Sequence, residues 1–187
     1  LFRSDFVPIL DELDLPDAPI RFVFPHAPMQ PVTINGGYVM RAWYDILTQD
    51  IVRREDEAGV RASQRAVERL MRREEERGTP WHRIVLAGFS QGGAIALHTG
   101  LRQSKPIAGV MALSTYVPVA EKLAAEAAPT SRGVPIFYAH GTADPVVQLP
   151  RAVASRELLE QLGYAVEWHE YRMPHSVCEP EIADIGA

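Results

Sequence analysis

The chain has 187 residues, of which 47% are hydrophobic and 23% charged, and these proportions exclude a disordered or collagen-like chain. At roughly 150 residues per domain, this length predicts a single domain. A net charge of −5 gives no electrostatic footprint for a nucleic-acid backbone or an anionic membrane surface. The longest apolar runs are far shorter than the roughly 18 residues that a membrane span needs, so we expect no stable membrane anchoring.

Short apolar runs alternate along the chain with helical patterns, which is typical of βαβ units around a mainly parallel sheet. We expect strands at Arg21–Phe24, Arg83–Ala87, Ile107–Leu113, Val134–Tyr138 and Ala165–Tyr171. Residues 25–46 carry prolines, Asn-Gly-Gly and aromatic residues without a clear period. We expect loops there, of a length that often borders a functional site.

Helices are expected between the strands, where apolar side chains recur at helical spacing. They cover Asp56–Arg77, Gln91–Leu101 and Pro150–Leu162, and a last helix begins near Glu179 and Pro180. The predicted fold class is therefore α/β, with a mainly parallel central sheet flanked by helices.

A glycine-rich turn, Gly88-Phe89-Ser90-Gln91-Gly92-Gly93, directly follows one predicted strand and precedes a predicted helix. This is the context that a G-x-S-x-G nucleophile elbow requires. Glycines two residues before and after the serine permit close approach of strand and helix, where a Cβ would clash. The turn lifts the Ser90 hydroxyl above the sheet and aims the Gln91 N–H at developing negative charge. A plain glycine-rich turn is the alternative.

A serine nucleophile needs a base that a third group holds, and in this type of fold the chain order is Ser, then Asp or Glu, then His. Asp144 lies on the loop after the strand that ends at Tyr138, although it could simply form a turn before Pro145. His175 lies in the loop beyond the following strand. His169 competes as the base, but it lies inside the strand pattern.

Metal and cofactor signatures are missing from the sequence. His140 and Asp144 are four residues apart without a third ligand at a persuasive spacing, and no nucleotide-binding glycine pattern occurs. We therefore expect no metal and no cofactor, and we expect His140 to hold its turn beside Gly141. The single cysteine, Cys178, excludes internal disulfides and fits a reducing, cytoplasmic compartment.

Taken together, these motifs resemble the phospholipase/carboxylesterase family, which includes the acyl-protein thioesterases. The resemblance covers nearly the whole chain and is close to bacterial carboxylesterases. It rests on the turn at residues 88–93, on His140-Gly141-x-x-Asp144-x-Val146-Val147 and on a loop histidine at position 175. It also rests on Phe24–Pro28, Pro31–Tyr38, Arg41–Asp45 and Ala112–Tyr116. It implies an α/β-hydrolase fold, serine esterase or thioesterase activity and a triad of Ser90, Asp144 and His175. It also implies that Trp43, Leu47 and Val147 line the acyl pocket.

Two features depart from the family pattern. Pro174 stands before the candidate histidine, where the family usually has glycine. The family begins with a strand that ends in an L-H-G-x-G loop, and this loop supplies a second N–H to the oxyanion. This sequence instead opens with Leu1–Phe6, which resembles the segment just after that loop. We therefore expect residues 1–187 to form one domain that lacks the N-terminal strands, the oxyanion loop and the end of the last helix.

The sequence thus predicts a serine carboxylesterase that hydrolyses short-to-medium acyl esters through an acyl-enzyme intermediate. Two alternatives stay open: a thioesterase or lysophospholipase acting on long acyl chains, and a non-catalytic binding module with this fold. The expected partner is a small ester or thioester and not a nucleic acid, and a homodimer is left open.

Overall fold

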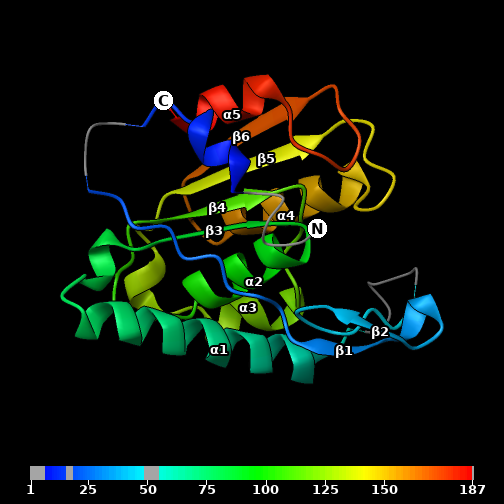
Figure 1. The fold of residues 1–187 in the computed structure, drawn as a ribbon, viewed down its shortest axis with the longest axis horizontal. Helices are drawn as coiled ribbons and strands as arrows, with labels where there is room; N and C mark the ends of the chain where they lie inside the picture. The colour runs from blue at the N-terminus through cyan, green and yellow to red at the C-terminus, as the bar shows by residue number, and fades with distance from the viewer. Residues whose placement is uncertain (1–6, 16–18, 49–54, 187) are drawn as a thin grey trace.

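A parallel four-stranded sheet forms the centre of the molecule in the computed structural model, which describes residues 7–15, 19–48 and 55–186 (Figure 1). The strands follow one another in chain order as β3 (Val85–Phe89), β4 (Gly109–Leu113), β5 (Ile136–Gly141) and β6 (Val166–Tyr171). Every neighbouring pair is parallel, so all four strands end at the same edge. The prediction of a mainly parallel sheet flanked by helices is confirmed.

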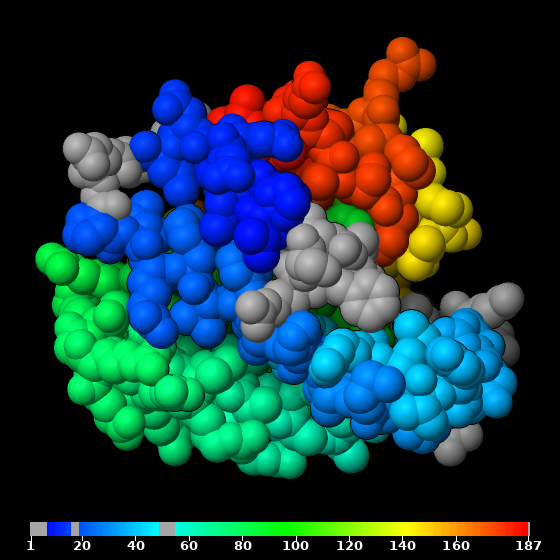
Figure 2. Space-filling model, viewed as in Figure 1, coloured from blue at the N-terminus to red at the C-terminus, as the bar shows by residue number. Residues whose placement is uncertain are grey.

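Helices cover both faces of this sheet. One face carries α1 (Glu57–Glu76), α2 (Gln91–Gly100), α3 (Ala120–Glu126) and α4 (Leu149–Gln161), and the other carries α5 (Glu179–Gly186) (Figure 1). In Figure 2 the N-terminal residues, drawn in blue, lie against the red C-terminal helix, where a Cβ on Gly186 would lie 3.0 Å from the Asp14 backbone nitrogen. Within the described ranges, none of the helices is both long and apolar enough to cross a membrane.

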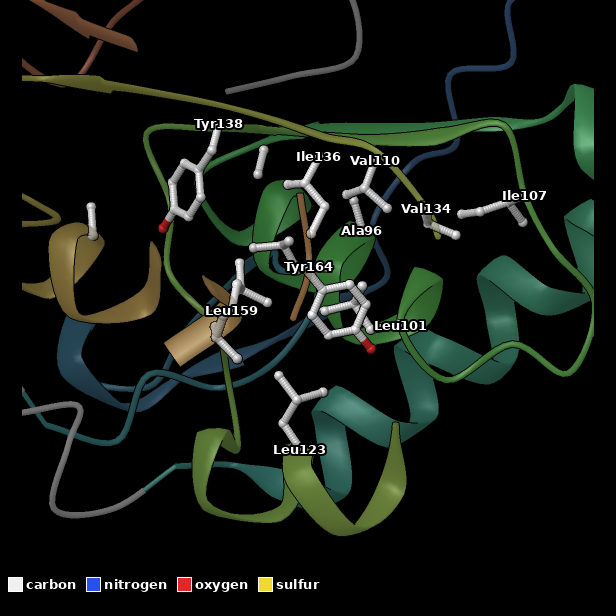
Figure 3. Packing of buried hydrophobic residues seen from close by; sticks show 14 of the residues in the cluster. Ala96, Leu101, Ile107, Val110, Leu123, Val134, Ile136, Tyr138, Leu159 and Tyr164 are labelled. Carbon is white, nitrogen blue, oxygen red and sulfur yellow. The ribbon is translucent and has the colours of Figure 1, made fainter. Parts of the chain in front are cut away.

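The main core lies between the sheet and the first helical layer (Figure 3). Ala96 of α2 and Leu101, the residue directly after α2, share one buried cluster with Val110 of β4, Ile136 of β5 and Leu159 of α4. On the other face, Val177 and Ile185 pack against a buried cluster of Phe89, Leu113 and Ala139, which belong to β3, β4 and β5. Both faces of the sheet are thus apolar, as expected for parallel strands covered on two sides.

Most predicted elements occur within two residues of their expected bounds. At the start of α1, the Asp56 carboxylate accepts the Gly59 N–H at 2.9 Å, and after its end Gly78 takes a φ of +97°. The helix α3 had no clear periodic signal and was not predicted. The expectations about Leu1–Phe6 and about the chain beyond Gly186 lie outside the described residues.

Two predictions about residues 21–46 are wrong. Arg21–Phe24 is not a strand, because in the described part of the chain β3 pairs with β4 alone and Phe22 and Val23 remain exposed. The expected loop contains an antiparallel hairpin of β1 (Met29–Val32) and β2 (Tyr38–Arg41). Its turn uses Gly36 and Gly37 at φ values of +67° and +78°, which glycine adopts without strain.

Two buried ionisable groups give the fold opposite responses to pH. Glu181, in the first turn of α5, is fully buried, and within the part of the chain that the structure describes neither of its oxygens has a hydrogen bond of normal geometry. Burial raises the pKa of Glu181 from 4.5 to about 7, against the effect of the nearby Cys178 N–H. Burial, together with Arg102 and Arg61, lowers the pKa of His98 to about 4.

Replacing Glu181 by glutamine should therefore change how stability depends on pH. Between pH 4.5 and 7 the unfolded wild type releases the Glu181 proton while the folded state keeps it, so this group's contribution to stability falls as pH rises. The glutamine side chain of the variant does not ionise, and the effect of His98 is common to both proteins. Urea unfolding at several pH values measures the free energy of unfolding of both proteins. As pH rises through this range, the wild type should lose about 3 kcal/mol relative to the variant. A difference that stays constant with pH would contradict the burial argument.

Candidate active site

Ser90 occupies the tight turn between β3 and α2. Its backbone has φ +55° and ψ −123°, a conformation that non-glycine residues rarely adopt. Hydrogen bonds hold the strained peptide in place, because the Ser90 N–H donates to the Leu113 carbonyl at 2.9 Å. The Ser90 carbonyl accepts the Ala94 N–H at 3.1 Å and the Thr115 hydroxyl at 2.7 Å. The turn therefore has the strand–turn–helix geometry that the sequence predicts.

Three side chains that are far apart in the sequence meet at the C-terminal edge of the sheet. His175 Nε2 lies 3.0 Å from Ser90 Oγ, and His175 Nδ1 lies 2.6 Å from Asp144 Oδ2. The Phe89 ring packs against the imidazole with its centroid 4.6 Å away. Since a carboxylate only accepts hydrogen bonds, Nδ1 carries the proton and the lone pair of Nε2 faces the serine hydroxyl.

Asp144 forms a turn and also orients the histidine, with one carboxylate oxygen for each task. Oδ1 accepts the N–H groups of Val146 and Val147 at 2.8 and 2.9 Å, which closes the turn. Oδ2 is left to face His175. The carboxylate is buried, so solvent does not compete for either oxygen. The two interpretations of Asp144 that the sequence left open are thus compatible.

His140 stabilises the loop that carries Asp144 and Val147. Its Nε2 lies 2.7 Å from the Val147 carbonyl, an acceptor, so Nε2 donates this hydrogen bond. The side chain is fully buried against Trp168, and burial lowers the pKa of His140 and favours the neutral imidazole. The prediction that His140 holds its turn is confirmed.

The competing histidine, His169, lies elsewhere on β6. Its Nε2 pairs with Glu167 Oε1 at 2.8 Å, and its ring stacks on Phe137 and Tyr171. The structure therefore brings His175, and not His169, to Ser90.

Pro174 does not keep His175 away from Ser90. The Met173 carbonyl accepts the Ala143 N–H at 3.1 Å, which ties this loop to the turn of Asp144. A Cβ on Gly141 would lie 2.5 Å from the Met173 carbonyl oxygen and 2.6 Å from that of Pro174. Glycine is thus required at position 141, because the backbone before His175 packs directly against it. The sequence pattern contains the His140-Gly141 pair but does not reveal this packing role.

The expected pocket residues are only partly brought together. Trp43 and Val147 belong to one apolar cluster with Tyr44, Ile95 and Tyr116. Leu47 is half-buried and is not part of this cluster. Gln91 is the first residue of α2, so its N–H is one of the first-turn donors that lack an acceptor within the helix. In the part of the chain that the structure describes, no group of His, Cys, Asp or Glu side chains could hold a metal ion.

The glycines of the turn differ in importance. A Cβ on Gly88 would lie 2.2 Å from the Gly92 carbonyl carbon, and one on Gly93 would lie 2.7 Å from the Gly88 oxygen. A Cβ on Gly92 would meet only Trp43 Nε1, at 3.8 Å. The expectation that the glycines on both sides of the serine leave no room for a Cβ is therefore correct for Gly88 and wrong for Gly92.

Comparison with known proteins gives a consistent result. A family model described as Phospholipase/Carboxylesterase matches residues 11–187. Acyl-protein thioesterase 1 of Mycosarcoma maydis is 45% identical over an alignment of 183 positions that covers 90% of this chain and 76% of the relative. Acyl-protein thioesterase 1 of Neurospora crassa is 42% identical over an alignment of 172 positions that covers 87% of this chain and 70% of the relative. The crystal structure of Arabidopsis thaliana SOBER1 matches with a TM-score of 0.91 at 28% identity, over 100% of this chain and 90% of that chain.

Alanine substitutions at the two outer glycines of G-x-S-x-G should have different effects on stability. Gly88→Ala places a Cβ into the backbone of the facing helix, so we expect a loss of more than about 2 kcal/mol in unfolding free energy. Gly92→Ala adds a methyl group within a helix that makes only an ordinary van der Waals contact with Trp43, and we expect a change between zero and a gain of about 1 kcal/mol. Urea unfolding gives the free energy of unfolding of both variants and of the wild type. Equal losses in the two variants would contradict the contact geometry.

Proposed function

Because the chain belongs to the phospholipase/carboxylesterase family of α/β-hydrolases and is a hydrolase of esters or thioesters, we propose that Ser90 is its catalytic nucleophile and carries the acyl group as an acyl-enzyme. The observation that carries this proposal is the line of hydrogen bonds from Ser90 Oγ to His175 and from His175 to Asp144, at 3.0 and 2.6 Å. Membership in this family argues against the non-catalytic binding module.

In the first half of the reaction, Ser90 Oγ attacks the acyl carbonyl while His175 Nε2 takes its proton. The buried Asp144 carboxylate stabilises the imidazolium that forms and keeps its ring in this orientation. The Gln91 N–H donates to the oxyanion of the tetrahedral intermediate. His175 then gives the proton to the leaving alcohol or thiol, and the acyl group remains on Ser90.

In the second half, a water molecule replaces the leaving group. His175 takes one proton from this water as it attacks the acyl-enzyme carbonyl, and the same tetrahedral geometry forms at the Gln91 N–H. Collapse of the intermediate releases the carboxylic acid, and the proton returns from His175 to Ser90. Esters and thioesters follow the same steps, since only the leaving atom differs.

Our first candidate substrate is a small ester with a short or medium acyl chain. Trp43 lies against the cluster that contains Val147, close to the first turn of α2, and a bulky indole at this place can close off a long acyl channel. The net charge of −5 also disfavours an anionic lipid surface. We further propose a cytoplasmic location, which the single cysteine supports.

The relatives favour a second candidate with the same chemistry. The two curated relatives described above are named acyl-protein thioesterase 1, and they are 45% and 42% identical to this chain. A thioester that links an acyl chain to a protein would be cleaved by the same nucleophile and base. The two candidates differ only in acyl length and in the leaving group.

Substitutions in the three side chains test the proposed mechanism. Ser90→Ala removes the nucleophile, and we expect kcat for p-nitrophenyl butyrate to fall by at least about a thousandfold. His175→Gln should cost about as much, whereas His169→Gln serves as the matched control and should stay within about twofold of the wild type. Circular dichroism checks that each variant is folded. The assignment is wrong if Ser90→Ala keeps more than a few per cent of the rate or if His169→Gln is the inactive variant.

Acyl length separates the two substrate candidates. Each methylene that enters an apolar pocket adds about 0.8 kcal/mol of burial, so kcat/KM should rise stepwise to the end of the pocket and then fall. We expect a maximum at a medium chain in a p-nitrophenyl series from acetyl to palmitoyl, at constant detergent. A continued rise to palmitoyl, together with faster cleavage of an S-palmitoyl peptide, would favour the acyl-protein thioesterase.

A further inference from the structure

The Gln91 side chain joins the serine turn to a separate segment of the chain. Its Oε1 accepts the Trp43 N–H at 2.9 Å, and its Nε2 donates to the Tyr44 carbonyl at 2.9 Å. The primary amide thus pairs with one backbone donor, at Trp43, and one backbone acceptor, at Tyr44. Only one orientation of the amide satisfies both groups, because a flipped amide would place two donors and two acceptors against each other.

Other hydrogen bonds hold the same segment, residues 43–45, against α1 and against the loop after β4. The Ser63 hydroxyl of α1 donates to the Trp43 carbonyl, and the Asp45 N–H donates to Asp56 Oδ2 at 2.9 Å. The hydroxyls of Tyr44 and Tyr116 lie 2.8 Å apart in the buried cluster. These contacts set the position of the segment against its neighbours, while the Gln91 amide sets its position against Ser90.

Trp43 is the residue whose position this arrangement controls most directly. Its side chain is half-buried against the cluster that contains Val147, and its Nε1 lies next to Gly92, two residues after the serine. Since both its N–H and its carbonyl are held by hydrogen bonds, its backbone has little freedom to shift. The indole is therefore held beside the turn that carries Ser90 and the Gln91 N–H.

We propose that the Gln91 side chain determines acyl specificity by holding Trp43 as a wall of the acyl site at a fixed distance from Ser90. This inference rests on the proposed function of Ser90, and it assigns a role to the side chain of Gln91 that is separate from that of its N–H. Without the amide, the Trp43 N–H and the Tyr44 carbonyl lose their partners and the wall moves. The loss falls most heavily on acyl chains long enough to touch that wall.

Three variants test the proposal. Gln91→Leu has a similar size and makes neither hydrogen bond, whereas Gln91→Glu can accept from the Trp43 N–H but cannot donate to the Tyr44 carbonyl. Gln64→Leu is the matched control, because Gln64 bonds to Glu68 along the surface of α1. The readout is the ratio of kcat/KM for p-nitrophenyl octanoate to that for p-nitrophenyl acetate. We expect it to fall at least tenfold in Gln91→Leu, mainly through KM, to fall less in Gln91→Glu, and to stay unchanged in Gln64→Leu. Equal losses on both esters would overturn the proposal.

Hydrogen–deuterium exchange at the Trp43 amide measures, without any substrate, how firmly the Gln91 side chain holds the Trp43 N–H. The Trp43 amide should exchange at least tenfold faster in Gln91→Leu than in the wild type, and its protection should be retained in Gln64→Leu. Unchanged exchange in Gln91→Leu would overturn the proposal even in an active enzyme. If the wild type hydrolyses neither ester, the proposed function fails, and faster exchange would still show that the amide holds Trp43.

Discussion

The strained backbone of Ser90 is the constraint on which the rest of the site depends. A non-glycine residue at φ +55° costs on the order of 1–3 kcal/mol, and it persists only where the surrounding structure enforces it. Here Gly88 and Gly93 let the strand and helix touch. The Leu113 carbonyl at the end of β4 and the Thr115 hydroxyl in the loop after it hold the serine backbone. The strain keeps the hydroxyl above the sheet edge, where the other side chains can reach it.

Parallel topology explains why the other two residues arrive there. Because β3, β5 and β6 all run in the same direction, the loops after them open at one edge, and these loops carry Ser90, Asp144 and His175. Contacts between the loops then set the distances. Gly141 allows the loop of His175 to pack on that of Asp144, and the buried His140 donates to the Val147 carbonyl beneath. In the proposed mechanism these contacts hold the base against the nucleophile before substrate binds.

Local patterns were enough to predict the residues that now lie together, but not everything around them. The G-x-S-x-G turn and the chain order pointed to Ser90, Asp144 and His175, because each follows a strand that its apolar run marks clearly. Arg21–Phe24 is also apolar, yet a strand needs a partner as well as an apolar run. Within the described residues β3 pairs with β4 alone, and the local pattern of residues 21–24 could not show this. The Gln91 amide and the Thr115 hydroxyl act across 48 and 25 residues of chain, and no local spacing reveals such contacts.

The central claim is that His175 and Asp144 activate Ser90. The most direct measurement is the rate at which a fluorophosphonate modifies the protein, followed by intact mass and peptide mapping, because this reagent reports an activated serine without depending on the substrate. We predict a single adduct on Ser90 that forms at least about a hundredfold more slowly in His175→Ala. An adduct on another residue, or an unchanged rate in His175→Ala, would contradict the account.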